Sequence, residues 1–206
     1  MNCYERWILP YLLDRSMRLK LTLPYRERIA ARARGVVLEV GIGSGLNLPF
    51  YPSGVERVVG VDPSPELLRI TGPRTKSAPF PVELLCGSGE ALPLEEGSVD
   101  TVLTTWTLCS IPDAARALSE MRRVLKPGGE LLFVEHGRAP DAGVARWQDR
   151  LTPVWKRLSG GCHLNREPAR LIRAAGFRVD DLHADYAPGP RVMTYCYEGK
   201  ATKQAS

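Results

Sequence analysis

The sequence has no two cysteines at the C-x-x-C spacing of common zinc sites, although it contains five cysteines in 206 residues. An odd number of scattered cysteines is also atypical of a disulfide-rich secreted domain. The pattern therefore predicts neither a metal site nor disulfides, and a reducing cytoplasm is the expected setting. The cysteines are Cys3, Cys86, Cys109, Cys162 and Cys196.

Long apolar runs, internal repeats and low-complexity tracts are absent as well. Charged residues interrupt the apolar stretches too often for a bilayer-spanning helix, and the first residues lack the cleavage site of a signal peptide. Without a linker-like segment, residues 1–206 are expected to form a single domain. A chain of this size buries roughly 70% of its unfolded surface, which is enough for a substantial core.

The net charge of +5 lies entirely before residue 35, because residues 1–34 hold eight Arg or Lys and three Asp or Glu. One interpretation is that this segment forms one or two helices over a ligand cleft. In the other, apolar side chains enter an anionic membrane surface while basic ones attract head groups. The chain has no stacking platform or recognition helix, which argues against nucleic acid as a partner. The candidate membrane residues are Trp7, Ile8, Leu12, Leu13, Arg15, Arg18 and Lys20.

Three glycines at alternate positions follow the first apolar, β-branched run, residues 37–40. Gly41, Gly43 and Gly45 allow the backbone to turn sharply and to approach a ligand, and Asp62 ends the next apolar run. This order of strand, glycine turn, strand and acid predicts a site for a nucleoside with a ribose diol.

A glycine missing from the dinucleotide motif narrows the choice of ligand. Leu46 stands where G-x-G-x-x-G requires glycine, and Glu39 at the mouth of the turn would repel a pyrophosphate and attract a cation. Only residues 47–52 are available for a helix before the next strand, too few for a long phosphate-binding helix. A cationic nucleoside without phosphate is therefore favoured, and S-adenosylmethionine (SAM) fits that description.

Further segments resemble those of class I SAM-dependent methyltransferases: E-x-G-x-G-x-G at 39–45, D-P-S at 62–64, G-S-G-E-A-L-P-L at 87–94 and L-K-P-G-G at 125–129. The resemblance implies a Rossmann-like α/β fold with helices on both faces of a seven-stranded, mostly parallel sheet whose strand 7 is antiparallel. Expected strands are 37–40, 58–62, 82–86, 101–105, 130–136, 177–182 and 191–197, with Ser64 capping one helix and Asp113 capping another, 113–125.

In such a fold Glu39 contacts the methionine ammonium, Asp62 the ribose and residues 88–91 the adenine. Ser88 replaces a frequent aspartate, so its contact with the adenine is expected to be weaker. The cofactor-binding residues that the resemblance implies are Glu39, Gly41, Gly43, Ser44, Gly45, Asn47, Asp62, Pro63, Ser64, Ser88, Gly89, Glu90, Ala91, Thr105 and Trp106.

A narrower resemblance rests on W…L-x-P-x-W…G-C-x-L-x-R-E at 147–167, with L-C-S at 108–110 and V-E-H at 134–136. These segments are similar to the branch that holds animal alkyl-thiol S-methyltransferases and bacterial proteins loosely described as phospholipid methyltransferases. This implies in-line methyl transfer to a small apolar acceptor, most simply a thiol. Phosphatidylethanolamine or another amphipathic acceptor, and a SAM-binding sensor or scaffold without turnover, are the alternatives.

The acceptor side is expected to involve the long connection 137–166, which would cover the substrate. His136 and His163 are candidate bases, and Arg166 is a candidate for stabilising a thiolate. Structural roles are equally open for these residues. His136 could bond a carbonyl, His163 could be an exposed loop residue, and Arg166 could cap a helix or form an ion pair. The candidate pocket residues are Cys109, Trp147, Trp155 and Cys162.

Overall fold

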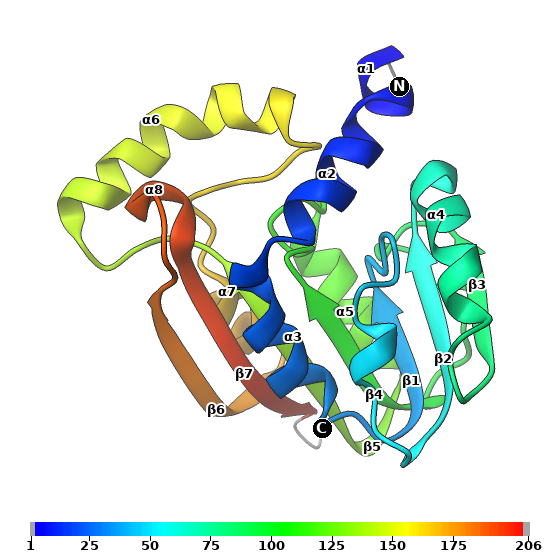
Figure 1. Ribbon diagram of the computed structural model, residues 1–206. Helices are drawn as coiled ribbons and strands as arrows, with labels where there is room; N and C mark the ends of the chain where they lie inside the picture. The colour runs from blue at the N-terminus through cyan, green and yellow to red at the C-terminus, as the bar shows by residue number, and fades with distance from the viewer. Residues whose placement is uncertain (1–2, 204–206) are drawn as a thin grey trace.

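The computed structural model of the protein describes residues 3–203 and contains one sheet of seven strands, in the order β3-β2-β1-β4-β5-β7-β6 (Figure 1). Strands β1 to β5 pair in parallel, and β7 runs antiparallel to both β5 and β6. The predicted mostly parallel sheet with antiparallel strand 7 is thereby confirmed. The strands are β1 (Gly35–Val40), β2 (Val55–Asp62), β3 (Val82–Cys86), β4 (Val99–Thr105), β5 (Leu125–His136), β6 (Phe177–Tyr186) and β7 (Tyr195–Lys203).

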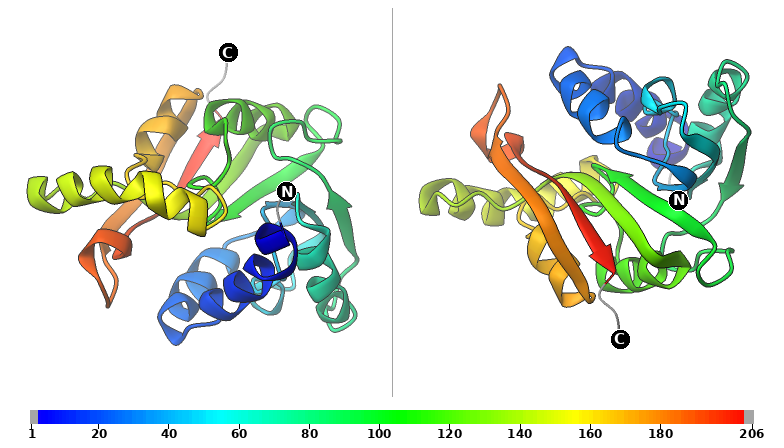
Figure 2. Two further views of the ribbon diagram at one scale, coloured as in Figure 1. Left: turned by 90° about the horizontal axis from the view of Figure 1, so that it is seen from above. Right: turned by 90° about the horizontal axis from the view of Figure 1, so that it is seen from below.

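Helices cover both faces of the sheet (Figure 2). Successive side chains of β1 point to opposite faces, so Val37 packs in the core beside Ile29, while Leu38 packs in the core beside Leu118. Burial on both faces explains why β1 is apolar in sequence apart from Glu39. The helices are α1 (Cys3–Trp7), α2 (Leu9–Met17), α3 (Leu23–Ala30), α4 (Pro65–Thr75), α5 (Ala114–Val124), α6 (Ala142–Leu158), α7 (Pro168–Ala174) and α8 (Arg191–Thr194), with 3₁₀ turns η1 (Lys20–Thr22) and η2 (Leu48–Phe50).

Both predicted helix caps are present. Ser64 Oγ accepts a hydrogen bond from the Leu67 amide at 3.2 Å at the start of α4, and Asp113 Oδ1 accepts one from the Arg116 amide at 3.0 Å at the start of α5. Each cap satisfies an amide that would otherwise have no partner in the first helical turn. After Asn47 only the short turn η2 forms, as the spacing predicted.

The strand expected over 191–197 is partly wrong. Residues Arg191–Thr194 form the short helix α8, and β7 begins only at Tyr195. The proline before it holds φ at −63°, the Met193 amide donates to the Pro190 carbonyl at 2.8 Å, and a helical turn results. Strand β7 then continues to Lys203, well beyond the predicted end.

The basic N-terminal segment folds into α1, α2, η1 and α3. A bidentate ion pair links α3 to β7. The Arg28 guanidinium donates to the Glu198 carboxylate at 2.6 and 3.0 Å. Helix α2 stands at the end of the sheet where β1 and β4 finish (Figure 1). None of the helices within residues 3–203 combines the length and the apolar character needed to cross a bilayer.

Candidate active site

A cleft of about 560 Å³ lies at the carboxyl ends of β1, β2 and β4. The strand order reverses between β1 and β4, and crevices at such points are where α/β sheets bind ligands. Helix α2, the glycine turn, the loops after β2, β3 and β4, and residues 159–161 form its walls. The predicted cofactor residues that line it are Gly41, Gly43, Ser44, Asp62, Pro63, Ser64, Ser88, Gly89, Glu90, Thr105 and Trp106.

The glycine turn is held against the acid at the end of β2. Asp62 Oδ2 accepts from the Gly43 amide and Oδ1 from the Ser64 amide, both at 2.9 Å. Burial raises the pKa of Asp62, while these two amides act in the opposite direction. Because each carboxylate oxygen has a second lone pair, Asp62 can still accept two hydroxyls from the cleft.

Glu39 lies behind the cleft wall and is only 1% exposed. Its Oε1 accepts from Asn47 Nδ2 at 2.7 Å, and its Oε2 accepts from the Tyr51 hydroxyl at 2.6 Å. Burial raises the pKa of this carboxyl to about 7. The structure therefore places the Glu39 carboxyl behind the cleft wall, hydrogen-bonded to Asn47, and neither residue lines the cleft. Gly45 and Ala91 also lie outside the lining.

Arg26 of α3 is a cleft residue that the sequence motifs did not identify. Its side chain is buried, its Nη1 donates to Asn47 Oδ1 at 2.7 Å, and its Nε has no hydrogen-bond partner. The guanidinium carbon lies 5.0 Å from the centre of the Trp106 ring. A buried cation with an unused donor is suited to an anionic group of a ligand. No local pattern marks Arg26, because its position depends on how α3 packs.

Beyond Trp106 the structure brings together a cluster of sulfur and imidazole groups, Cys109, His136 and Cys162, none of which lines the cleft. Trp106 has φ +51°, a rare conformation for a non-glycine residue that is frequent at functional sites. Just past it, Cys109 is buried beside Cys162, and His136 Nε2 lies 2.9 Å from Cys162 Sγ. Hydrogen bonding to Cys162 and the nearby His136 hold the pKa of Cys109 well below its usual range. Trp155 Nε1 donates to Cys162 Sγ at 3.3 Å.

A buried carboxylate orders the loop that carries this cluster. Glu135 Oε1 accepts from Thr104 Oγ1 and from the amides of Thr107 and Leu108, at 2.9 to 3.1 Å, whereas Oε2 has no partner. Burial raises the pKa of Glu135 to about 8. The V-E-H segment formed part of the family resemblance, but the role of Glu135 in ordering the loop was not predicted.

Arg166 and His163 hold the same loop from the other side. Arg166 donates to the carbonyl oxygens of Leu108, Ile111 and Pro112, with Nη1 2.6 Å from the Ile111 oxygen. The His163 amide and ring Nδ1 lie 2.8 and 3.1 Å from the Cys109 carbonyl. Both side chains thus act on loop position, and neither lines the cleft.

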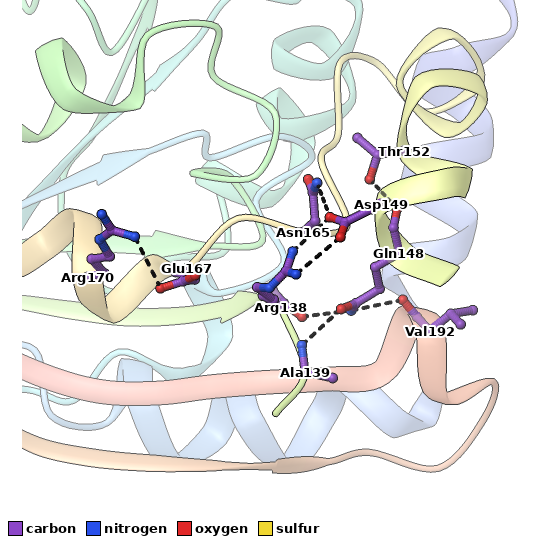
Figure 3. Close-up of polar contacts among 10 residues, drawn as sticks. Arg138, Ala139, Gln148, Asp149, Thr152, Asn165, Glu167, Arg170 and Val192 are labelled. Carbon is purple, nitrogen blue, oxygen red and sulfur yellow. Dashed lines mark hydrogen bonds and ion pairs between the residues drawn. The ribbon is translucent and has the colours of Figure 1, made fainter. Parts of the chain in front are cut away.

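The connection 137–166 is fastened by a polar network around α6 (Figure 3). Gln148 accepts from the Ala139 amide at 2.9 Å, and Asp149 binds Arg138 at 2.7 Å and Asn165 at 2.8 Å. Only the end of the connection, residues 159–161, reaches the cleft.

The two tryptophans of α6 lie elsewhere than the sequence suggested. Trp147 is 55% exposed with Arg150 over its ring, so it lies outside the cleft. Trp155 supports Cys162 through the hydrogen bond above and does not line the cavity itself. Neither position could be read from the W…L-x-P-x-W pattern, because helix spacing does not say which face of α6 meets the domain.

Comparison with known proteins identifies the family. The Methyltransferase domain family matches residues 38–133. The rat thiol S-methyltransferase TMT1B is 37% identical over 177 residues, covering 81% of this chain and 70% of the relative. This chain belongs to the SAM-dependent methyltransferases. It is therefore an enzyme of that class, with SAM as its cofactor.

Two further relatives of the methyltransferase bear on its fold and acceptor. The phosphatidylethanolamine N-methyltransferase of Cereibacter sphaeroides is 36% identical over 138 residues, covering 65% of this chain and 66% of the relative. A Haloferax volcanii putative methyltransferase, solved with the activator Trm112, matches with a TM-score of 0.75 and 20% identity, over 100% of this chain and 99% of that one. At that identity the structural match supports the fold alone.

Gly41→Ala is expected to damage the methyltransferase, whereas Gly143→Ala is expected to stabilise it. Gly41 has φ +73°, and an added Cβ would collide with the Thr107 side chain, so we expect a loss of about 1–3 kcal/mol and weaker SAM binding. Gly143 lies in α6 with open space around it, so alanine should add about 0.5–1 kcal/mol. Urea unfolding and calorimetric SAM titration measure both. Equal effects at the two sites would contradict the strain argument.

Glu39→Gln is expected to remove a pH dependence of stability. A carboxyl whose pKa is raised by folding, here to about 7, stabilises the fold fully below its unfolded value and loses that contribution as pH rises through 7. The wild-type unfolding free energy should therefore fall by about 3 kcal/mol more between pH 5 and 8 than that of the variant. Glutamine can still accept from Asn47 and donate to Tyr51. Exposed Glu56→Gln is the control, and parallel profiles for Glu39→Gln and wild type would refute the assignment.

Proposed function

We propose that this methyltransferase methylates the sulfur of a small apolar thiol. The similarity to the rat thiol S-methyltransferase, which extends over 81% of the chain, carries the proposal. The cleft supports it, because part of its wall is apolar and because Ser110 and Gly161, which line it, are the chain neighbours of Cys109 and Cys162. The apolar wall residues are Leu9, Leu13, Met17, Trp106 and Ile111.

The cofactor would be held by groups at both ends of the glycine turn. Asp62 is placed to accept the ribose hydroxyls, and Gly41 and Gly43 let the backbone approach the nucleoside. The unused Nε of Arg26 suits the methionine carboxylate, and the ionised form of Glu39, behind the cleft wall, would favour the ammonium. The adenine would lie against residues 88–90, as the family motif implies.

The protein's task is chiefly one of alignment. When bound, SAM supplies an electrophilic methyl group and leaves as S-adenosylhomocysteine. The chain must hold the acceptor in line and exclude water, and such positioning is worth about 7–11 kcal/mol. Trp106 and the apolar wall from α2 perform that role in this cleft, while Glu135 and Arg166 fix the loop that bears Cys109.

Product analysis with chemically matched acceptors tests the proposal. The protein is incubated with SAM and a series of short apolar thiols, with the alcohols of equal chain length as controls, and then with phosphatidylethanolamine vesicles. We expect S-adenosylhomocysteine and thioether in equal amounts from the thiols alone. Turnover confined to phosphatidylethanolamine would favour the activity named for the Cereibacter relative. Binding of SAM without turnover on any acceptor would indicate a sensor or scaffold.

We also propose that the N-terminal helices contact an anionic membrane surface beside the cleft. Leu9 and Leu13 of α2 face the cleft, whereas Trp7, Ile8 and Leu12 are between 50% and 58% exposed. Nearby basic residues would attract anionic head groups. Flotation with anionic and neutral vesicles checks this, with Trp7→Ser and Leu12→Ser combined as the variant. No association at low salt would reject the proposal and leave α2 as a cleft wall.

A further inference from the structure

Cys109, His136 and Cys162 form a group with the composition of a metal site. One sulfur, one imidazole nitrogen and a second sulfur all lie within 4.8 Å of one another. They come from three separate parts of the fold: the loop after β4, the end of β5 and the connection between α6 and α7. The sequence places all three on the acceptor side but predicts no metal site, because no two of them are near each other in the chain.

The spacing suits a tetrahedral ion. With bonds of about 2.3 Å to sulfur and about 2.0 Å to nitrogen, ligand atoms in such a site are roughly 3.5–3.8 Å apart. His136 Nε2 and Cys162 Sγ are 2.9 Å apart, closer than in such a site, and no two of the three ligand atoms are more than 4.8 Å apart. Side-chain movements of less than about 1 Å would bring all three atoms to ligand distance.

The surroundings suit bound thiolates. The Trp155 indole donates to Cys162 Sγ at 3.3 Å, and the Ser110 hydroxyl lies 3.5 Å from Cys109 Sγ. Hydrogen bonds of this kind orient the ligands of metal sites. Two thiolates and a neutral imidazole also balance the charge of a divalent ion, which allows the group to be buried.

We propose that Cys109, His136 and Cys162 bind a zinc ion whose fourth position is open to the acceptor thiol. Three protein ligands with one open position are typical of catalytic zinc. None of the three ligand residues lines the cleft itself, but Ser110 and Gly161, each next to a cysteine ligand in the chain, do line it, so the group lies behind this part of the wall and the thiol would reach the open position from there. This proposal rests on the proposed thiol substrate and adds the means by which that thiol is activated.

The chemistry of the step is a proton loss on coordination. The sulfur of the incoming thiol donates a lone pair to the ion, its S–H bond breaks, and the proton leaves to solvent. Nothing is oxidised or reduced. The product thioether carries no charge and binds zinc weakly, so it would leave the open position free for the next thiol. A hydroxyl of the same size would not be activated equally, because soft sulfur ligands suit zinc better.

Metal analysis of the full chain tests the site independently of turnover. The protein is purified under reducing conditions without chelator, and zinc is measured by mass spectrometry. We expect one zinc per chain in wild type. Apoprotein prepared with a chelator should bind added Zn²⁺ at least about 100-fold more tightly than Cys162→Ala or His136→Ala does. Cys86→Ser and His183→Gln, which alter an exposed cysteine and an exposed histidine, should match wild type.

Cobalt substitution then examines the open position. Co²⁺ bound to the wild-type apoprotein should show a sulfur-to-metal charge-transfer band that strengthens when propanethiol is added, since a third thiolate joins the ion. Propanol should leave the band unchanged. These spectra need no SAM and no turnover.

The outcomes separate this proposal from the proposed function. Zinc absent from wild type, zinc binding equal in Cys162→Ala, or a Cys109–Cys162 disulfide in the freshly purified protein would each overturn the metal site. Thiol methylation would stand in all three cases if the acceptor assay supports it. Conversely, bound zinc with no response to propanethiol would overturn the open position, and methylation of phosphatidylethanolamine alone would overturn the thiol substrate.

Discussion

Asp62→Ala is expected to weaken SAM binding by at least about 100-fold. Hydrogen bonds to a charged acceptor contribute about 1.5–3 kcal/mol each, and Asp62 is placed to accept from two ribose hydroxyls. Its removal would also release the Gly43 and Ser64 amides that it now holds at 2.9 Å, which loosens the glycine turn. Each 1.4 kcal/mol is a tenfold change in affinity, so two lost bonds alone account for this effect. Isothermal titration with SAM measures it.

Asp100→Asn is the matched control for this variant. Asp100 also accepts a backbone amide, that of Val36 at 2.9 Å, and it binds Lys126 at 2.8 Å, but it lies near the start of β4, away from the cleft. We expect lower stability with SAM affinity unchanged within about threefold. If Asp62→Ala and Asp100→Asn weaken SAM binding equally, the loss reflects general instability and Asp62 has no special role.

The parts of the fold that could be predicted are those that local rules determine. Ser64 and Asp113 cap their helices because a short acceptor before a helix satisfies the first free amides, whatever the rest of the fold does. The residues 37–40 and 58–62 form parallel strands because their mostly apolar, β-branched side chains suit strands that are buried on both faces. The helix at 191–194 was not predicted. The β-branched and aromatic residues of 191–197 favoured a strand in the sequence analysis, although Pro190 begins a helical turn in the structure.

The site residues also fall into two groups, those that local sequence predicts and those that depend on packing. Asp62 and the glycines follow β1 and β2 directly, so their place at the sheet edge follows from the strand order. Arg26 depends on how α3 packs, and the Cys109, His136 and Cys162 group depends on three loops that meet only in the folded chain. A search for C-x-x-C pairs cannot detect such a group. A better signal is the pairing of β4 with β5. L-C-S follows β4 and V-E-H ends β5, so the two segments meet at the same edge of the sheet.

His136→Ala is expected to lower turnover with a thiol by about 100-fold or more, while SAM affinity changes by less than about threefold. Its Nε2 lies 2.9 Å from Cys162 Sγ, outside the lining of the cleft, whereas the glycine turn and Asp62 form a separate region that does line it. Loss of a group that activates a nucleophile costs about 10²–10⁴ in rate. Steady-state kinetics and SAM titration of the same preparation give the two quantities, and exposed His183→Gln should retain both.

The pattern of rescue distinguishes activation of the thiol from simple support of the loop. If His136 acts by favouring the thiolate, raising the pH toward the pKa of the free thiol should restore part of the lost rate, because the thiolate then forms without help. A structural defect would persist at every pH and would lower the unfolding free energy to match. Turnover that is unchanged in His136→Ala would remove His136 from the mechanism and with it activation of the thiol by zinc, because the variant lacks one of the proposed ligands.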